Sequence, residues 1–322
     1  MMAVLGSGNF TYEVSGKNWG KLPEGWSYRE ATSVDVDSSD NVYIFNRGSH
    51  PMIILDSNGN FLRSWGEGLF TSPHGVTIDP DDSVWCVDNK DHSIRKFTGE
   101  GRLVFTLAGR NRPSPAMSGK PFNGPTRVAI DPRNREILVA DGYGNARVHR
   151  FSPDGKKILN SWGESGTDPG QFNIVHDIAI DRDGWIYIGD RENRRIQIFS
   201  PDGRFETQWG NFSRTACVHI SGGNEPLVYV GEYFGGGPEA YQTGKRLGPR
   251  ISILDTRGNL IERLGDKPFG DEPGRFYAPH AVATDSRGDI YVAEVSYTEF
   301  GMLMTPPREL RSMQKLIRKR RT

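Results

Sequence analysis

Short apolar runs along the chain are separated by turns rich in Asp, Gly, Ser and Asn. Runs of β-branched and aromatic residues between such turns are typical of β-strands. A helical period, with apolar residues at i, i+3 and i+4, is almost absent from the sequence. The hydrophobic pattern therefore predicts an all-β protein.

The strand pattern recurs six times. Each unit has a first strand followed by Asp, a turn, a second strand rich in β-branched and aromatic residues, a loop, a third strand, a turn such as SPDG or DSNG, and a fourth strand that often ends in Trp-Gly. The aligned first strands contain Val34, Val76, Val128, Ile178, Val218 and Val282. Four strands repeated every 40 to 50 residues or so indicate a β-propeller, whose blades bury their faces against one another. We therefore predict an all-β, six-bladed β-propeller.

The sixth unit ends before a fourth strand, whereas residues 9–20 have the Trp-Gly ending without a unit of their own. We expect the N-terminal segment, residues 1–20, to supply this outer strand, because closure leaves no strand edge unpaired. No linker interrupts the repeats. The sequence therefore predicts a single domain over residues 1–322, with a short basic end at residues 315–322.

Composition adds constraints on partners and compartment. Forty basic residues balance forty acidic ones, so the net charge indicates neither a nucleic acid nor a membrane as partner. Cys86 and Cys217 are too few for a disulfide framework and favour a reducing compartment. The sequence shows no secretion signal and no apolar run of about 18 residues. We expect a soluble, cytoplasmic protein, and the sequence leaves its oligomeric state open.

Three histidines stand at the same place in alternate units. His74, His176 and His280 each precede the aligned apolar residue by two positions and are 102 and 104 residues apart. Because the first strand of a propeller blade is innermost, these imidazoles should converge on the central axis. Three neutral imidazoles with an open fourth position are typical of a catalytic zinc site. The alternative is a set of channel histidines bonded to backbone carbonyl groups.

The loops after the second strands contain the other candidate residues. Arg47 and Arg191 align with each other, and Tyr143 lies one place further on in its own unit. Beside a metal, two guanidinium groups can clamp a carboxylate and a phenol can act as acid or base. Without a metal, the arginines would pair with carboxylates and Tyr143 would pack.

The six NHL-like units, with the strings FNRG, PHGVTID, DGYGNAR, DRENRRIQ and PHAVA, resemble the peptidyl-α-hydroxyglycine α-amidating lyases over essentially the whole chain. This resemblance implies a six-bladed propeller that binds Zn²⁺. It places the zinc ligands on His74, His176 and His280, the catalytic tyrosine on Tyr143, and the active-site arginines on Arg47 and Arg191.

The sequence departs from the family pattern at several points. Ala278 stands where the family has a methionine that lines the pocket, and Ala281 stands where it has an aspartate that binds a structural Ca²⁺. Structural calcium is therefore not expected here. The family's disulfides cannot form from Cys86 and Cys217 alone. With no copper monooxygenase domain or secretion signal in the sequence, the conversion of secreted peptide hormones is not expected either.

The resemblance implies a zinc-dependent lyase that cleaves the N–C bond of a carbinolamide to an amide or amine plus glyoxylate or another aldehyde. The expected partner is a small, carboxylate-bearing substrate held by Arg47 and Arg191, with either Tyr143 or a zinc-bound hydroxide as the base. Two alternatives stay open. A protein-binding NHL propeller would need no metal, and a propeller lactonase or hydrolase would normally hold calcium with carboxylates and Asn.

Overall fold

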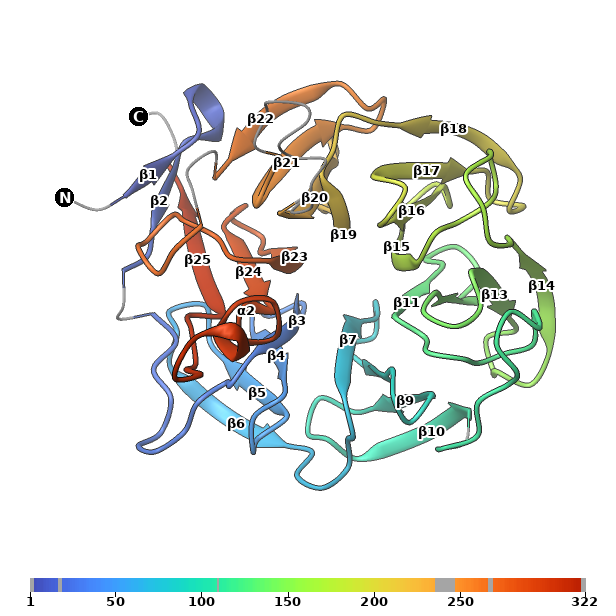
Figure 1. Cartoon of the computed structure of the whole chain (residues 1–322), viewed down its shortest axis with the longest axis horizontal. Coiled ribbons are helices and arrows are strands. Elements are labelled where there is room, and N and C mark those ends of the chain that lie inside the picture. The colour runs from blue at the N-terminus through green and yellow to red at the C-terminus, as the bar shows by residue number, and fades with distance from the viewer. Residues whose placement is uncertain (1–2, 17–18, 109, 235–246, 266–268, 320–322) are drawn as a thin grey trace. The chain divides into compact units, whose positions relative to one another are not determined.

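The computed structural model describes residues 3–16, 19–108, 110–234, 247–265 and 269–319. The chain divides into two compact units: unit 1 is Met1–Trp65 with Phe212–Thr322, and unit 2 is Gly66–Asn211. In the described residues, six antiparallel sheets follow one another along the chain, three in each unit. These sheets, numbered here as blades 1 to 6 in chain order, confirm the predicted six-bladed β-propeller (Figure 1). That residues 1–322 form a single domain stays a prediction.

Unit 2 contains blades 2, 3 and 4. Blade 2 has β7 (Pro73–Ile78), β8 (Val84–Asp88), β9 (Ser93–Phe97) and β10 (Leu103–Ala108). Blade 3 has β11 (Arg127–Ile130), β12 (Ile137–Asp141), β13 (Arg147–Phe151) and β14 (Ile158–Trp162). Blade 4 has β15 (Val175–Ile180), β16 (Ile186–Asp190), β17 (Arg195–Phe199) and β18 (Phe205–Trp209).

Blade 3 shows why the second strands are apolar throughout. Successive side chains of β12 point to opposite faces of the sheet. Leu138 and Ala140 pack in a core shared with blade 4, whereas Ile137 and Val139 pack in a core shared with blade 2. Both faces of the strand are therefore buried, as in parallel sheets covered on both sides. This packing places β11 between β7 and β15 within unit 2 (Figure 1).

Unit 1 contains blades 1, 5 and 6. Blade 1 has β3 (Ala31–Val36), β4 (Val42–Asn46), β5 (Met52–Leu55) and β6 (Phe61–Trp65). Blade 5 has β19 (Arg214–Ile220), β20 (Leu227–Tyr233), β21 (Arg250–Asp255) and β22 (Leu260–Leu264). Blade 6 has β23 (Pro279–Thr284), β24 (Ile290–Glu294), β25 (Met313–Arg318), β2 (Tyr12–Val14) and β1 (Val4–Leu5). Short helices are η1 (Gly8–Phe10), α2 (Ser296–Glu299) and η2 (Gly301–Leu303).

The N-terminal segment completes blade 6, as the sequence predicts. Strand β2 pairs antiparallel with β25 through Tyr12↔Arg318 and Val14↔Leu316. Strand β1 then pairs with β2 and adds a fifth strand that the repeat pattern does not predict. Tyr12 and Val14 are buried in the core shared by blades 5 and 6. The two ends of the chain are therefore joined by one sheet.

We expect deletion of residues 1–20 to lower the melting temperature by roughly 10 °C or more and to promote aggregation, because it unpairs the β25 edge. It also uncovers the core that Tyr12 and Val14 cover, and each large buried apolar side chain contributes about 1.5–3 kcal/mol. In a chain of this size about 1 kcal/mol shifts Tm by roughly 2 °C. Thermal unfolding checks this, with Val4→Ser, on the exposed face of β1, as control. A truncated protein as stable as the full chain would rule out the closing role.

Among the residues that the structure describes, no helix combines the length and hydropathy needed to cross a membrane.

Candidate functional site

The loops at the ends of the second strands are held by buried carboxylates. Asp141 accepts a hydrogen bond from the backbone N–H of Asn123 at 2.9 Å, and Asp190 accepts one from Asn173 at 2.7 Å. Glu294 likewise accepts a hydrogen bond from the backbone N–H of Tyr277 at 2.5 Å. Burial raises the pKa of Asp190 and the pKa of Glu294. These carboxylates tie the loop that leads into each first strand to the loop that leaves the second strand, which fixes the candidate side chains.

The string DGYGN positions Tyr143 within unit 2. A Cβ atom at Gly142 would collide with the backbone of Val175, and one at Gly144 would collide with Asn123. Only glycine fits at both positions, because the backbone passes so close to its neighbours. The Tyr143 N–H donates to the carbonyl oxygen of Gly124 at 3.2 Å. The ring is thereby presented from a fixed backbone, with 37% of the residue exposed.

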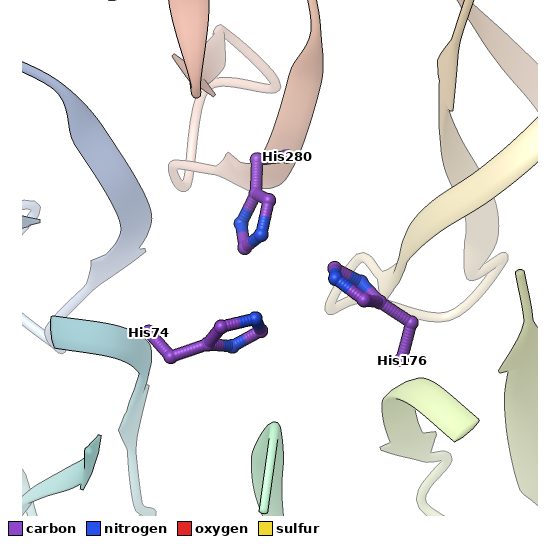
Figure 2. Close-up of side chains that lie close together, drawn as sticks. All are labelled: His74, His176 and His280. Carbon is purple, nitrogen blue, oxygen red and sulfur yellow. The ribbon is translucent and has the colours of Figure 1, made fainter. Parts of the chain in front are cut away.

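His74 and His176 lie beside Tyr143 in unit 2. Both histidines are buried, and their ring centroids are 5.0 Å apart. The Tyr143 hydroxyl oxygen is 3.1 Å from Nε2 of His74 and 3.1 Å from Nε2 of His176. Figure 2 shows these two imidazoles turned toward each other. Residues from blades 2, 3 and 4 therefore form one cluster of polar side chains.

The tautomer of His74 follows from its partner. Its Nδ1 lies 2.9 Å from the carbonyl oxygen of Thr126. A carbonyl oxygen can only accept, so in the neutral imidazole Nδ1 carries the proton and Nε2 keeps its lone pair. This lone pair can accept the Tyr143 hydroxyl proton or bind a cation. A metal-bound histidine commonly donates its second N–H to a backbone carbonyl in this way.

Arg191 contacts the phenol from blade 4. Its Nη1 lies 3.4 Å from the Tyr143 oxygen, and its guanidinium carbon lies 5.6 Å from the centre of the ring. Arg191 is only 8% exposed, and its Nε donates to Glu192 at 2.8 Å. Arg191 therefore places a fixed positive charge beside the phenol oxygen. The structure thus joins Tyr143 to one of the two predicted arginines.

An ion pair borders the unit 2 cluster and was missed by the sequence reasoning. Arg127 Nε lies 3.6 Å from Asp177 Oδ1, and Asp177 directly follows His176. Each member stands one place after the aligned histidine column, on the inner strands β11 and β15. Arg127 and Asp177 stand at the same aligned position in the neighbouring blades 3 and 4, so their opposite charges could have indicated the ion pair from the sequence.

His280 has the same local arrangement in unit 1. It is buried, and its Nδ1 lies 2.5 Å from the carbonyl oxygen of Thr32. Thr32 and Thr126 occupy the histidine column of blades 1 and 3, so a threonine carbonyl meets an imidazole in each case. By the argument given for His74, Nδ1 of His280 carries the proton and Nε2 keeps a lone pair.

Arg47 is held by a buried carboxylate in unit 1. Its Nη1 lies 2.6 Å from Oε1 of Glu30 and 3.3 Å from the hydroxyl of Thr298. Glu30 also accepts from the backbone N–H and the hydroxyl of Thr298. The sequence reasoning did not single out Glu30. Arg47 is therefore held by a buried carboxylate, Glu30, and the prediction that it clamps a substrate stays a prediction.

Comparison with known proteins first shows to which class of β-propeller the chain is similar. The model of the NHL repeat matches residues 70–97, 122–151 and 172–199, which are the cores of blades 2, 3 and 4. A gluconolactonase structure from Xanthomonas campestris has the same fold, with a TM-score of 0.58 and 10% identity over 90% of this chain and 87% of that chain. The protein is an NHL-repeat β-propeller.

Relatives of the chain in sequence include amidating enzymes. The chain is 30% identical to peptidyl-glycine alpha-amidating monooxygenase B of Xenopus laevis, over 89% of this chain and 35% of that protein. It is 33% identical to peptidyl-alpha-hydroxyglycine alpha-amidating lyase 1 of Drosophila melanogaster, over 78% of this chain and 48% of the lyase. The chain thus spans about a third of the first relative and about half of the second. This homology confirms the resemblance to the amidating lyases that the sequence motifs predict.

Proposed function

We propose that the protein is a metal-dependent carbon–nitrogen lyase. Its substrate would be an N-acyl-α-hydroxyglycine, and its products would be a primary amide and glyoxylate. The observation that carries this proposal is the cluster of Tyr143 with His74, His176 and Arg191, found in a chain homologous to named amidating lyases. The same homology supports a lyase-like enzyme with a small-molecule substrate.

The histidines fit a metal ion. His74, His176 and His280 are all buried, and each can offer one imidazole nitrogen. Two of them have Nδ1 held by a threonine carbonyl, which leaves Nε2 as the donor atom. Neutral imidazoles are ligands that Zn²⁺ prefers, and three of them leave a position for substrate. We therefore assign the three histidines as the metal ligands and zinc as the metal.

When bound, the metal would act as a Lewis acid that favours ionisation of the substrate hydroxyl. Tyr143 takes up the hydroxyl proton, since its oxygen lies 3.1 Å from Nε2 of His74 and of His176 and Arg191 places a positive charge beside it. The electron pair of that O–H bond becomes the second bond of the aldehyde C=O. The C–N bond then breaks, and the nitrogen takes up the proton that Tyr143 accepted, which gives the primary amide and returns Tyr143 to its starting form. Every atom of the substrate is found in the two products.

The two arginines hold the glyoxylate end in this proposal. A guanidinium group binds a carboxylate through two parallel hydrogen bonds. Arg191 is fixed by Glu192 and Arg47 by Glu30, so both keep their orientation before substrate arrives. Part of the ordering cost of substrate binding is thereby removed in advance.

The test is a metal analysis followed by a glyoxylate assay on protein purified without a histidine tag. We expect about one zinc per chain. Metal-loaded protein should release glyoxylate from N-acetyl-α-hydroxyglycine, and chelation should stop this until zinc is added back. Metal-free protein without activity would favour a protein-binding propeller. Bound calcium with hydrolysis of lactones, and no glyoxylate release, would favour a propeller lactonase.

A further inference from the structure

His92 lies in the loop between β8 and β9 of blade 2, outside the histidine column. Two buried carboxylates fix this loop: Asp88 accepts from the backbone N–H of Asp91 at 3.1 Å, and Asp91 accepts from that of Ser93 at 2.9 Å. The second bond closes an Asx turn, in which His92 takes a left-handed conformation with a φ of 58°. The imidazole is therefore presented from a fixed backbone.

The imidazole of His92 reaches across to blade 3 within unit 2. Its Nδ1 accepts a hydrogen bond from the backbone N–H of Gly124 at 2.9 Å. Because an N–H can only donate, Nδ1 of the neutral imidazole keeps its lone pair and Nε2 carries the proton, the reverse of His74. This bond ties the loop of blade 2 to the segment that leads into β11.

Gly124 in turn holds Tyr143. Its carbonyl oxygen accepts from the Tyr143 N–H at 3.2 Å, and the carbonyl oxygen of Asn123 accepts from the Gly144 N–H at 2.8 Å. A Cβ atom added to Gly124 would lie 2.8 Å from Cβ of Tyr143, so this backbone packs directly against the base of the tyrosine side chain. A shift of Gly124 would therefore move the phenol relative to the two histidines that its hydroxyl contacts.

The position of the phenol depends strongly on this backbone. Tyr143 is 37% exposed, so packing does not enclose its ring on all sides. Its hydroxyl lies at the far end of the side chain, where a small rotation of the backbone becomes a larger displacement. A general base has to lie within hydrogen-bond reach of the proton that it accepts. A misplacement of about 1 Å can lower a rate by roughly 10².

We propose that His92 is a positioning residue, which holds Gly124 and through it the phenol of Tyr143. This inference rests on the proposed function, in which Tyr143 accepts the proton of the substrate hydroxyl. His92 contacts neither the substrate nor the metal in this proposal. Its loss should therefore lower kcat and leave KM and the metal content unchanged.

His92→Gly and His92→Asn separate the hydrogen-bond acceptor from the backbone conformation. Glycine and asparagine both adopt left-handed conformations, but only asparagine offers a side-chain oxygen that can replace Nδ1. We expect zinc-loaded His92→Gly to release glyoxylate from N-acetyl-α-hydroxyglycine with a kcat lower by roughly 10- to 100-fold. His92→Asn should stay within about threefold of the native kcat, because one neutral hydrogen bond replaces another. Lys90→Ala, which removes an exposed side chain of the same loop, should leave kcat unchanged.

A double-mutant cycle tests whether His92 acts through Tyr143. In the Tyr143→Phe variant, which lacks the hydroxyl, His92→Gly should cause no further loss of kcat, because the effects of two residues that act as a unit do not add. A second loss as large as the first would overturn the positioning role. Native kcat in His92→Gly alone would overturn it too.

Amide hydrogen exchange, measured by NMR, tests the same connection without turnover. In His92→Gly the amides of Gly124 and Tyr143 should exchange about fivefold faster or more, the equivalent of one lost hydrogen bond, and in His92→Asn they should stay slow. The amide of Arg191, which makes the corresponding bond to Ile174 in blade 4, should not change.

The two measurements fail in different ways. No glyoxylate from the native protein would overturn the proposed function, and faster exchange of both amides in His92→Gly would still support the connection from His92 to Tyr143. Unchanged exchange of the Tyr143 amide in His92→Gly would overturn the positioning role, whatever the activity.

Discussion

His176→Ala is expected to remove the bound metal and reduce glyoxylate release to background. In the proposed site His176 supplies one of three imidazoles, and two imidazoles no longer make the three-ligand site typical of catalytic zinc. Zinc per chain, measured by mass spectrometry of the metal after gel filtration, should fall from about one to near zero. His74→Ala and His280→Ala should have the same effect, although His280 belongs to unit 1 and the other two to unit 2.

His50→Ala provides the matched control. His50 lies in the loop between β4 and β5, outside the histidine column, and stacks on Trp26 with ring centroids 3.3 Å apart. This variant should keep its zinc and its activity. Full metal occupancy in a triple variant that lacks His74, His176 and His280 would place the metal elsewhere and contradict the assignment of the ligands.

The repeated pattern of strands and turns in the sequence predicts most of the fold. The aligned strings around Val76 and Ile178 both form first strands, β7 and β15, with the same register against their second strands. The repeat can be recognised in the sequence because each blade packs between two similar blades. Each blade therefore needs the same pattern of apolar side chains on its two faces. Strand β1 was not predicted. It is only two residues long and has no counterpart in the other blades, so no repeat signals it.

The histidines and arginines of the candidate site could be singled out because each residue type repeats in a column, whereas Tyr143 was indicated by the DGYGNAR string of the family resemblance. The threonines that hold two of the histidines occupy the same column as the histidines. The partners of the aligned arginines differ, since Arg47 meets Glu30 and Arg191 meets Glu192. Glu30 directly precedes β3, and since Ala31 pairs with Asn46 and the Arg47 N–H donates to the Glu30 carbonyl oxygen, the β3–β4 pairing brings the two side chains together. Alignment of the repeats therefore indicates that two residues occupy equivalent backbone positions, but the side chains that each one contacts are known only from the structure.

Tyr143→Phe is expected to lower kcat for glyoxylate release by roughly 10² to 10⁴, the usual contribution of a positioned acid or base. The variant keeps the ring, and the flanking glycines hold the same backbone, so the fold should persist. Zinc content should also persist, because the hydroxyl contacts His74 and His176 without being one of the proposed ligands. KM should change little, since the lost interaction acts in the transition state.

Arg191→Lys is the informative companion to Tyr143→Phe. A lysine retains the positive charge beside the phenol but loses the planar fork that binds a carboxylate. If Arg191 mainly orients the substrate, this variant should raise KM. If it mainly stabilises the phenolate of Tyr143, to which Nη1 is 3.4 Å distant, kcat should fall and the pH profile should shift.

Parental turnover by zinc-loaded Tyr143→Phe across the pH range would remove the phenol from the mechanism. The base would then be a hydroxide held at the metal.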